Sequence, residues 1–338
     1  MIHDNILFHN AADLETREGI PGKILPRYPR AVRDSFNERG RMMAMESTGV
    51  EIRFVTTSPN VRIYLSTLDT DAQVWVQRGN YSLGRFPVAA GKMTPVQVVT
   101  PERFAGMKPG SLVDGMFSPD VWRFAFNRNV GVFHALDTFG HSIRAPRPDE
   151  LPQKRYLAYG SSITHGSLTG YVAHTARRLK ADLLNKGLSG SCHCEKEAAD
   201  FLSEKCEFDY ATLELGVNMR GHYEPPEFRR RAEYLIHQMI KKHPSKPVFV
   251  ITVFPNFETF WKERTLHGTH DEAYTEILRD IVAKLKHPTL QIIEGAEVLT
   301  EFSGLGQDLI HPSEEFGHVH MGENLARIMA ERMAKMSP

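Results

Sequence analysis

The chain has 338 residues, of which 41% are hydrophobic and 24% are charged, and these ordinary values exclude a disordered or fibrous protein. A chain of this length favours two domains, since a domain usually has about 100 to 200 residues. Lysine and arginine together number 41, and aspartate and glutamate together also number 41. The balanced charge excludes recognition of nucleic acid or anionic lipid by bulk charge.

The start of the chain and its cysteines bear on the cellular location. The first ten residues lack the basic region and apolar run of a signal peptide, and nowhere do eighteen apolar residues follow one another. The three cysteines, Cys192, Cys194 and Cys206, are too few and too clustered to crosslink a chain of this size. We therefore expect a cytoplasmic protein in a reducing compartment, without a membrane partner.

The first part of the chain, residues 1–145, carries the patterns of β-strands, with short apolar runs between Gly, Pro, Asn and Asp turn signals. The runs lie at residues 50–55, 61–65, 74–76, 94–99 and 130–136. This arrangement predicts an antiparallel, jelly-roll-like β-sandwich. Residues 144–152 contain three prolines and are interpreted as a linker, so the first domain is expected to cover residues 1–150.

The second predicted domain, residues 151–338, alternates strands with helices. Apolar strands are predicted at residues 156–159, 210–215, 248–253 and 290–293. Amphipathic helices are predicted at residues 171–184, 227–242, 271–286 and 322–333. Continuous apolar strands joined by long helical crossovers indicate an α/β fold with a parallel sheet and helices on both faces. Such sheets bind ligands outside the carboxyl ends of their strands.

Two segments of this domain carry residues suited to nucleophilic catalysis. Ser162 lies just after the first strand, and Asp308 lies three positions before His311. A histidine can activate a serine by taking its proton, and a carboxylate on the same loop can orient the imidazole. The alternative interpretation makes them ordinary loop, capping and surface residues. The Gly-x-Ser-x-Gly elbow of the α/β-hydrolases is excluded, because position 164 is threonine.

Acyl transfer also needs hydrogen-bond donors where negative charge develops on the substrate oxygen. Gly190 follows one predicted strand region and could present its backbone N–H, since glycine allows close approach. Asn218 follows another strand and could offer its side-chain amide. An ordinary glycine turn explains each segment when it is taken alone, but the order and placement of the two segments together favour an oxyanion-binding site.

With these four segments, the second domain resembles the SGNH hydrolase family, also called the GDSL family, whose motif blocks contribute Ser, Gly, Asn and His in this order. The resemblance covers residues 154–335 or thereabouts. It implies a flavodoxin-like three-layer α/β/α fold. The site residues that it implies are the nucleophile Ser162, the base His311, its orienting acid Asp308, and the oxyanion donors Ser162, Gly190 and Asn218.

Two departures from the family pattern bear on this assignment. Gly-Ser-Ser stands at residues 160–162 where Gly-Asp-Ser is usual. This variation resembles a branch with an added N-terminal β-sandwich, similar in layout to some carbohydrate acetylesterases and to an acyltransferase of natural-product biosynthesis. Met219 stands where the family has an aspartate after the asparagine, and the loss of that carboxylate predicts a looser loop around Asn218.

Other residues admit two interpretations each. Cys192, His193 and Cys194 are soft ligands, but they lie closer together than the ligands of structural zinc sites, so no metal is predicted. Trp261 and His165 are predicted to contact substrate, with core packing as the alternative for Trp261. Aromatic residues of the first domain are expected in its core or at the domain contact, rather than in a carbohydrate-facing patch: Trp75, Tyr81 and Trp122.

The sequence therefore predicts a serine esterase that removes a short acyl group, above all acetyl, from a sugar or similar polar alcohol. The reaction needs no cofactor, and none is predicted. The expected partner is a small-molecule or oligosaccharide ester, not nucleic acid, and a homo-oligomer is compatible with the sequence. Two alternatives stay open, namely an acyltransferase that uses the same residues and a non-catalytic carbohydrate-binding protein.

Overall fold

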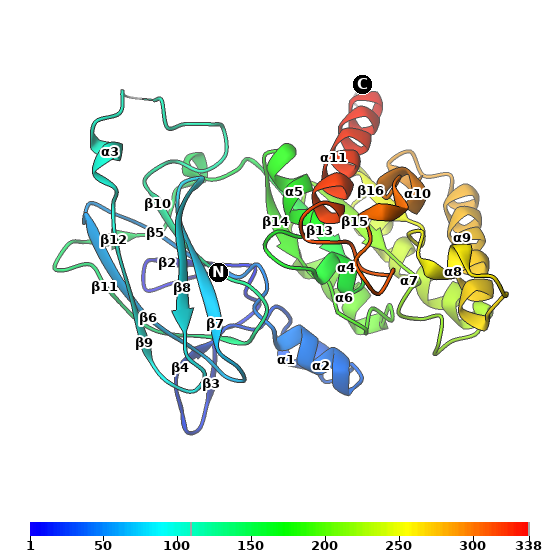
Figure 1. Cartoon of the computed structure of the whole chain (residues 1–338), viewed down its shortest axis with the longest axis horizontal. Helices are drawn as coiled ribbons and strands as arrows, with labels where there is room; N and C mark the ends of the chain where they lie inside the picture. The colour runs from blue at the N-terminus through cyan, green and yellow to red at the C-terminus, as the bar shows by residue number, and fades with distance from the viewer. Residues whose placement is uncertain (109, 337–338) are drawn as a thin grey trace. The chain divides into compact units, whose positions relative to one another are not determined.

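The computed structural model describes residues 1–108 and 110–336 and divides into two compact units (Figure 1). The first unit comprises Met1–Arg30 and Ala44–Gln153, and the second comprises Ala31–Met43 and Lys154–Pro338. The change of unit after residue 153 lies close to the predicted boundary at residue 150. The prediction is wrong for residues 31–43, which belong to the second unit because their side chains hydrogen-bond to residues 189–193.

The first unit contains two antiparallel sheets that share one apolar core, which confirms the predicted sandwich. One sheet has the strand order β1-β2-β5-β10-β7-β8, with β12 paired to β5, and the other has the order β3-β4-β11-β6-β9. The strands are β1 (Ile2–His3), β2 (Ile6–His9), β3 (Glu15–Arg17), β4 (Ile20–Ile24), β5 (Glu51–Thr56), β6 (Asn60–Thr67), β7 (Ala72–Arg78), β8 (Tyr81–Val88), β9 (Thr94–Val99), β10 (Val121–Phe126), β11 (Gly131–Asp137) and β12 (Ile143–Arg144).

The three aromatic residues singled out in the first unit have different environments. Trp122 is fully buried and belongs to the sandwich core, as expected. Trp75 is only partly buried, and the guanidinium of Arg85 packs over its ring at 3.9 Å. Tyr81 makes an edge contact with Phe104, which lies on the short helix α3 (Glu102–Ala105). The core expectation therefore holds for one of the three residues.

A buried ion cluster ties β5 to β10 in the first unit. Arg53 and Arg123 lie directly opposite each other across the two antiparallel strands, where like charges repel. Glu51 accepts hydrogen bonds from both guanidinium groups, at 2.8 Å from Arg53 Nε and 2.6 Å from Arg123 Nη2. Burial raises the pKa of the Glu51 carboxyl, but the two arginines outweigh burial and hold this pKa well below its usual range.

The second unit contains a five-stranded parallel sheet in the order β14-β13-β15-β16-β17. Numbered along the chain, this order is 2-1-3-4-5, which is the flavodoxin-like arrangement. Its strands are β13 (Lys154–Tyr159), β14 (Ala181–Asn185), β15 (Tyr210–Glu214), β16 (Val248–Ile251) and β17 (Leu290–Ile293). The predicted α/β fold with a parallel sheet is therefore confirmed.

Helices cover the two faces of this sheet (Figure 1). The longer helices are α5 (Tyr171–Arg178), α6 (Lys196–Lys205), α7 (Pro225–Lys242), α9 (Leu266–Leu285) and α11 (Gly317–Met336). Tyr156 and Ala158 of β13 share a core with α5 and α11, whereas Leu157, between them, is buried on the other face. The shorter helices are α1 (Arg30–Arg33), α2 (Glu38–Met45), α4 (Ser162–His165), α8 (Phe257–Phe260) and α10 (Gly295–Val298), with 3-10 turns at Pro148–Glu150 and Phe302–Gly304.

One predicted helix of the second unit is wrong in its extent. The pattern at residues 171–184 predicts a single helix, but α5 ends at Arg178 and Lys180 adopts a left-handed conformation with φ of +52°. The next five residues form β14, which pairs in parallel with β13. The apolar spacing of Leu179 and Leu183 fits a helix as well as a turn followed by a strand, so periodicity alone could not separate them.

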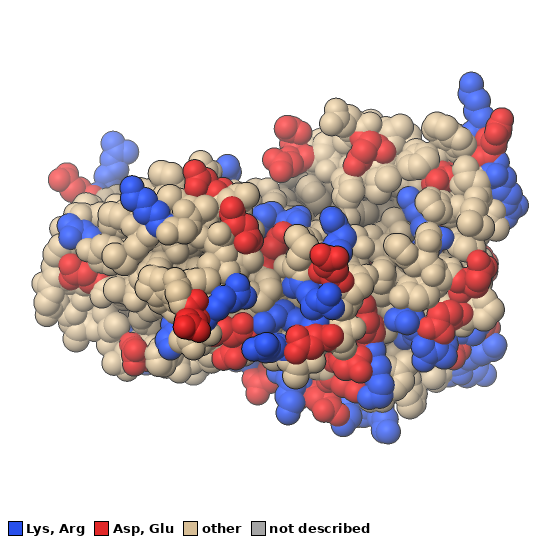
Figure 2. All heavy atoms as spheres, turned by 90° about the horizontal axis from the view of Figure 1, so that it is seen from below, with Lys and Arg blue, Asp and Glu red and all other residues tan. Residues whose placement is uncertain are grey.

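The surface carries charges of both signs. Figure 2 shows lysine and arginine interspersed with aspartate and glutamate over the face that it draws. This mixture agrees with the zero net charge of the sequence. Among the residues that the structure describes, none of the helices has the length and apolarity that crossing a membrane would require.

We expect Glu51→Gln to destabilise the first unit by about 3 kcal/mol, because it removes the carboxylate charge that lies between the buried Arg53 and the partly buried Arg123. The measurement is denaturant-induced unfolding at pH 7. The pKa of Glu51 is lower in the folded protein than in the unfolded chain. Its contribution to the free energy of unfolding is therefore fully present above the pKa of the unfolded chain, and it is lost as pH falls through the pKa of the folded protein. The exposed Glu102→Gln serves as control, and equal stability of both variants would contradict the role of the cluster.

Candidate functional site

A hydrogen-bonded chain joins the three residues expected to act together. The Oγ atom of Ser162 lies 2.7 Å from Nε2 of His311, and Nδ1 of His311 lies 2.6 Å from Oδ2 of Asp308. Ser162 begins α4, directly after β13, and the other two residues lie in the loop before α11. Residues 149 positions apart are thus brought together at the carboxyl end of the sheet.

The loop of Asp308 and His311 is a tight turn whose hydrogen bonds fix the carboxylate. Asp308 Oδ1 accepts hydrogen bonds from the backbone N–H groups of Ile310 and His311, both at 3.0 Å. Burial raises the pKa of Asp308, but the hydrogen bonds from the His311 ring and from these two N–H groups outweigh it, so the pKa is lowered on balance. The ionised Asp308 accepts a hydrogen bond from the Nδ1–H of His311. The Nε2 atom of His311 then carries no proton and can accept a hydrogen bond from the Ser162 hydroxyl.

The loop that carries Ser162 rests on a buried carboxyl group at the end of β15. Glu214 Oε2 accepts hydrogen bonds from the Ser161 backbone N–H at 2.7 Å and from the Thr164 hydroxyl at 3.1 Å. A Cβ atom at Gly160 would lie 2.5 Å from the same oxygen, so glycine is required there. Ser161 caps α4 by accepting from the Ile163 N–H. These contacts fix the direction in which Ser162 leaves the strand.

Burial of Glu214 has an electrostatic consequence. Its side chain is nearly inaccessible to solvent, and burial raises the pKa of the carboxyl to about 7, against the lowering effect of the hydrogen bonds from Ser161 and Thr164. The unfolded chain holds a glutamate with a pKa near 4.3. Glu214 therefore binds a proton more tightly in the folded protein. The sequence signal for this residue is a single charged side chain at the end of an otherwise apolar strand.

The segment 185–192 runs beside the Ser162 loop and is bonded to it. The Leu188 N–H donates to Gly160 O at 2.8 Å, and the Asn185 amide donates to the carbonyl groups of Thr164 and His165 at 3.1 Å. Gly190 lies in this segment with φ of +68°, a left-handed conformation that favours glycine. The structure therefore places the predicted glycine block directly alongside the predicted nucleophile.

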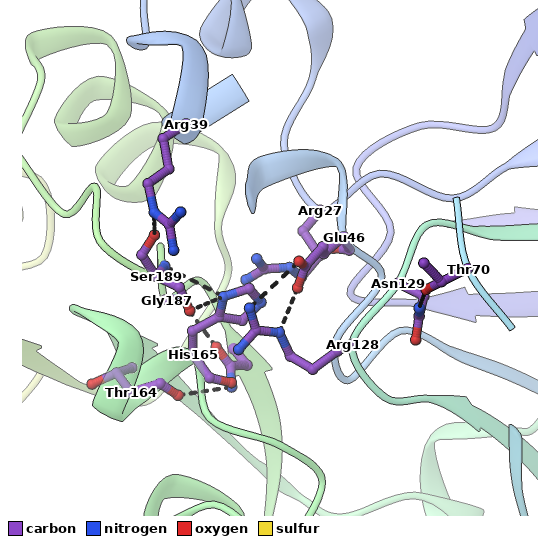
Figure 3. Close-up of polar contacts among 11 residues, drawn as sticks. Arg27, Arg39, Glu46, Thr70, Arg128, Asn129, Thr164, His165, Gly187 and Ser189 are labelled. Atoms are coloured by element: carbon purple, nitrogen blue, oxygen red, sulfur yellow. Dashed lines mark hydrogen bonds and ion pairs between the residues drawn. The ribbon is translucent and has the colours of Figure 1, made fainter. Parts of the chain in front are cut away.

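His165 has a different role from the one predicted. Its side chain is buried, and Nδ1 lies 2.8 Å from the hydroxyl of Ser189 (Figure 3). The Ser189 backbone N–H also points to this nitrogen, at 3.4 Å. The imidazole thus ties α4 to the Gly190 segment. This placement corrects the prediction that His165 contacts substrate, because its ring is used inside the protein.

Asn218 lies where the chain leaves β15, and its amide is oriented by a neighbour. Asn218 Oδ1 accepts a hydrogen bond from the Cys192 N–H at 3.2 Å. This contact identifies which end of the side-chain amide is the oxygen and which is the nitrogen. The N–H groups of its Nδ2 atom then point away from Cys192. The Asn218 amide is therefore an oriented donor next to the segment that contains Gly190.

The loop after Asn218 has contacts that the sequence does not predict. Met219 occupies the position of the family aspartate and is fully buried. The next residue, Arg220, is buried and donates to Asp271 Oδ2 at 2.5 Å, and its backbone carbonyl lies 2.7 Å from His270 Nδ1. Helix α9 thus supplies a carboxylate from another part of the chain. The looser Asn218 loop stays a prediction, and these contacts argue against it.

Trp261 remains a candidate substrate contact. It ends α8 with 58% of its surface exposed, and it makes an edge contact with Phe257, whose backbone N–H donates to Leu309 O at 2.9 Å. Core packing is therefore excluded, and α8 lies against the loop of the candidate base. Whether Trp261 contacts substrate stays a prediction that the structure alone does not test.

Metal ligands do not gather near this site. Within residues 1–108 and 110–336, no group of three or more His, Cys, Asp or Glu side chains is arranged to hold a metal ion. Cys192 and Cys194 are buried free thiols, and burial raises the pKa of Cys192 well above its usual value. Their environment is that of small apolar side chains in a core.

Comparison with known proteins finds a family model that matches part of the second unit. The model of the GDSL-like Lipase/Acylhydrolase family matches residues 158–317, which include Ser162, Gly190, Asn218, Asp308 and His311. None of the curated proteins matches the chain.

Solved structures share the fold of the whole chain. A salicylyl-acyltransferase, SsfX3, from a tetracycline biosynthetic pathway is 16% identical, covers 97% of this chain and 94% of its own, and has a TM-score of 0.77. An active-site mutant of a family two carbohydrate esterase from Clostridium thermocellum is 14% identical, with coverages of 98% and 99% and a TM-score of 0.63. An acetyl xylan esterase from Butyrivibrio proteoclasticus is 11% identical, with coverages of 99% and 97% and a TM-score of 0.58. At these identities the likeness concerns the fold.

We expect Glu214→Gln to change how stability depends on pH. The wild-type carboxyl has a raised pKa when folded, so its folded state loses stability as pH rises from about 4.5 to about 7. Glutamine does not titrate and retains an oxygen that can accept from Ser161 and Thr164. Unfolding free energies measured at pH 4.5 and pH 8 should show the variant gaining roughly 3 kcal/mol over wild type across this interval. Parallel pH profiles of the two proteins, with exposed Glu263→Gln as control, would contradict the burial argument.

Proposed function

We propose that this protein is a serine esterase that removes a short acyl group, above all acetyl, from a sugar or similar polar alcohol. The match of residues 158–317 to the GDSL-like Lipase/Acylhydrolase family supports this proposal. The observation that carries the proposal is the continuous hydrogen-bonded chain from Ser162 through His311 to Asp308. A serine, an imidazole and a carboxylate in this order are the groups that nucleophilic acyl transfer requires.

The proposed reaction has two steps. Ser162 Oγ attacks the ester carbonyl carbon while its proton passes to His311 Nε2, and the bond to the alkoxy oxygen then breaks as His311 returns the proton to the leaving alcohol. Water then attacks the acyl-serine carbonyl carbon and gives one proton to His311 Nε2. The bond to Ser162 Oγ breaks as His311 returns this proton to Oγ, and the carboxylic acid leaves. Asp308 stays ionised throughout and stabilises the imidazolium that forms in each step.

The oxyanion of each tetrahedral intermediate would be bound by the backbone N–H groups of Ser162 and Gly190 and by the amide of Asn218. Two contacts and one helix start support these roles. Leu188 fixes the Gly190 segment beside Gly160, and Cys192 orients the Asn218 amide. The Ser162 N–H belongs to the first turn of α4, where no intrahelical acceptor exists for it.

The polar nature of the proposed alcohol has two supports. His311 and Asp308 are nearly half exposed, so the leaving alcohol would meet a wet surface and not an apolar tunnel. Proteins of similar fold include carbohydrate esterases, one of them described in complex with cellohexaose. An oligosaccharide or small-molecule ester is therefore the proposed substrate, with Trp261 offered to a sugar ring. A cytoplasmic location is proposed from the sequence alone.

An acyltransferase is the second candidate function. It is favoured by the likeness in fold, at a TM-score of 0.77, to a salicylyl-acyltransferase over almost the whole chain. The same base can activate water or an acceptor alcohol, so the two reactions differ only in what attacks the acyl-serine. A non-catalytic carbohydrate-binding protein is disfavoured, because the hydrogen-bonded chain of three catalytic residue types is intact.

We expect Ser162→Ala to abolish hydrolysis of 4-nitrophenyl acetate and labelling by a fluorophosphonate probe, because both reactions need the serine oxygen. The loss of kcat should be on the order of 10³-fold or more. Ser167→Ala, in the same loop region, is the matched control and should keep its activity. Retention of wild-type turnover by the Ser162 variant would exclude the proposed nucleophile.

Product analysis should separate hydrolysis from transfer. Wild-type protein is incubated with an acetyl ester, with and without an excess of a polyol or sugar acceptor, and the products are quantified by mass spectrometry. For the esterase we expect free acetate as the main product in both reactions. Acetylated acceptor as the main product, at a rate above hydrolysis, would instead assign the protein as an acyltransferase.

A further inference from the structure

A helical segment from the first part of the chain contacts the proposed oxyanion site. Residues 31–43 belong to the same compact unit as the parallel sheet, although more than a hundred residues separate them from its first strand. Within this segment, Gly40 approaches Ser191 so closely that a Cβ atom would lie 3.0 Å from its hydroxyl. The segment therefore packs directly on the loop that contains Gly190.

Arg39 fixes one peptide group of that loop. Its Nε atom donates a hydrogen bond to the carbonyl oxygen of Ser189 at 3.0 Å (Figure 3). This carbonyl and the N–H of Gly190 belong to the same trans peptide group, so they point in opposite directions. A Cβ atom at Gly190 would lie 2.4 Å from Arg39 Nε, so the contact also requires glycine at this position. By holding the carbonyl, Arg39 aims the Gly190 N–H away from itself.

Asn37 is linked to the backbone of Asn218 through His193. Its Oδ1 atom accepts from the Gly40 N–H and from the Ser191 hydroxyl, both at 2.7 Å, which assigns the amide nitrogen to the other side. Nδ2 of Asn37 lies 3.3 Å from Nδ1 of His193, which must therefore accept. His193 then carries its proton on Nε2 and donates it to the backbone carbonyl of Asn218 at 3.2 Å.

The neutral form of His193 suits this direction of hydrogen bonding. Burial, together with the neighbouring His222, lowers the pKa of His193 to about 4, so the ring is uncharged near neutral pH. An uncharged imidazole accepts at one nitrogen and donates at the other. Three hydrogen bonds thus run in one direction: from the Gly40 N–H to Asn37, from Asn37 to His193, and from His193 to the Asn218 carbonyl.

We propose that Asn37 and Arg39 are positioning residues of the acyl-transfer reaction. Arg39 orients the Gly190 N–H toward the oxyanion, and Asn37, through His193, fixes the backbone from which the Asn218 side-chain amide extends. This inference rests on the proposed function, because it assigns the support of donors whose catalytic role is itself proposed. Neither residue belongs to the Ser162, His311 and Asp308 chain, and both are in the exposed class. Removing their side chains should therefore impair catalysis without unfolding the protein.

The test is a set of variants assayed with 4-nitrophenyl acetate. Arg39→Ala removes the donor, Arg39→Lys keeps the charge but moves the nitrogen one bond farther, and Arg39→Gln places an amide N–H at the bond distance of Nε without charge. Asn37→Asp keeps the acceptor for Gly40 and Ser191 but removes the donor to His193. Glu38→Gln, an exposed residue between the two, is the matched control.

We expect kcat to fall by about 10- to 100-fold in Arg39→Ala and by about tenfold in Asn37→Asp, with KM within a factor of two of wild type. Arg39→Gln should recover most of kcat, and Arg39→Lys should not. The rate of fluorophosphonate labelling of Ser162 should fall in proportion, because the phosphonyl oxygen needs the same donors. Unchanged melting temperatures would show that the segment stays folded.

Three results would overturn the inference. Wild-type kcat in both Arg39→Ala and Asn37→Asp would show that the donors need no such support. A rise in KM with unchanged kcat would make Arg39 a substrate-binding residue. Full recovery by Arg39→Lys but not by Arg39→Gln would assign its effect to charge. Failure of the proposed function is recognised separately, because Ser162→Ala would then keep its turnover.

Discussion

The loops of the candidate site meet because β13 forms parallel pairs with both β14 and β15. In parallel strands the carboxyl ends lie at one edge, so the segments that leave these three strands start side by side. The chain order reverses at β13, and a crevice opens at such a switch point because successive helices turn to opposite faces. Ser162, Gly190 and Asn218 each follow one of these three strands. The strand order thus gathers the proposed nucleophile and both added oxyanion donors before any side chain interacts.

Side-chain contacts then convert this proximity into a fixed geometry. Glu214 joins the end of β15 to the Ser162 loop, and Leu188 joins the segment after β14 to Gly160. Both contacts are buried, where hydrogen bonds are strong and an unpaired group is costly. The segment of Asp308 and His311 is different, because it is a partly exposed turn in which the Asp308 carboxylate accepts from the backbone N–H groups of Ile310 and His311. The proposed nucleophile Ser162 therefore follows a loop held by buried hydrogen bonds, whereas the proposed base His311 lies on a short surface turn.

The sequence was sufficient for the parts of this site that depend on local spacing. The pair at residues 308 and 311 lies within one turn, so its three-residue separation already fixes its geometry. The apolar strands and their order along the chain predicted the parallel sheet. The strand β14 was missed because two leucines four positions apart fit a helix equally well. The role of His165 was also misjudged, because its position in the motif says nothing about its partner Ser189, 24 residues later.

Support from distant residues explains what the sequence could not reveal. The missing aspartate at Met219 predicts a loose loop only if each family role must be filled at its own position. In the structure the carboxylate comes from Asp271, 51 residues further along, through the buried Arg220. Asn37 and Arg39 contact the other side of the same region from more than 140 residues earlier in the chain. Such contacts leave no periodicity or motif, because each involves a single polar side chain whose partner lies far away in the sequence. Short motifs therefore predict the proposed reactive groups of this fold, whereas the residues that orient them come from distant parts of the chain. A departure from a motif should be judged only after the rest of the chain has been searched for a residue that replaces the missing one.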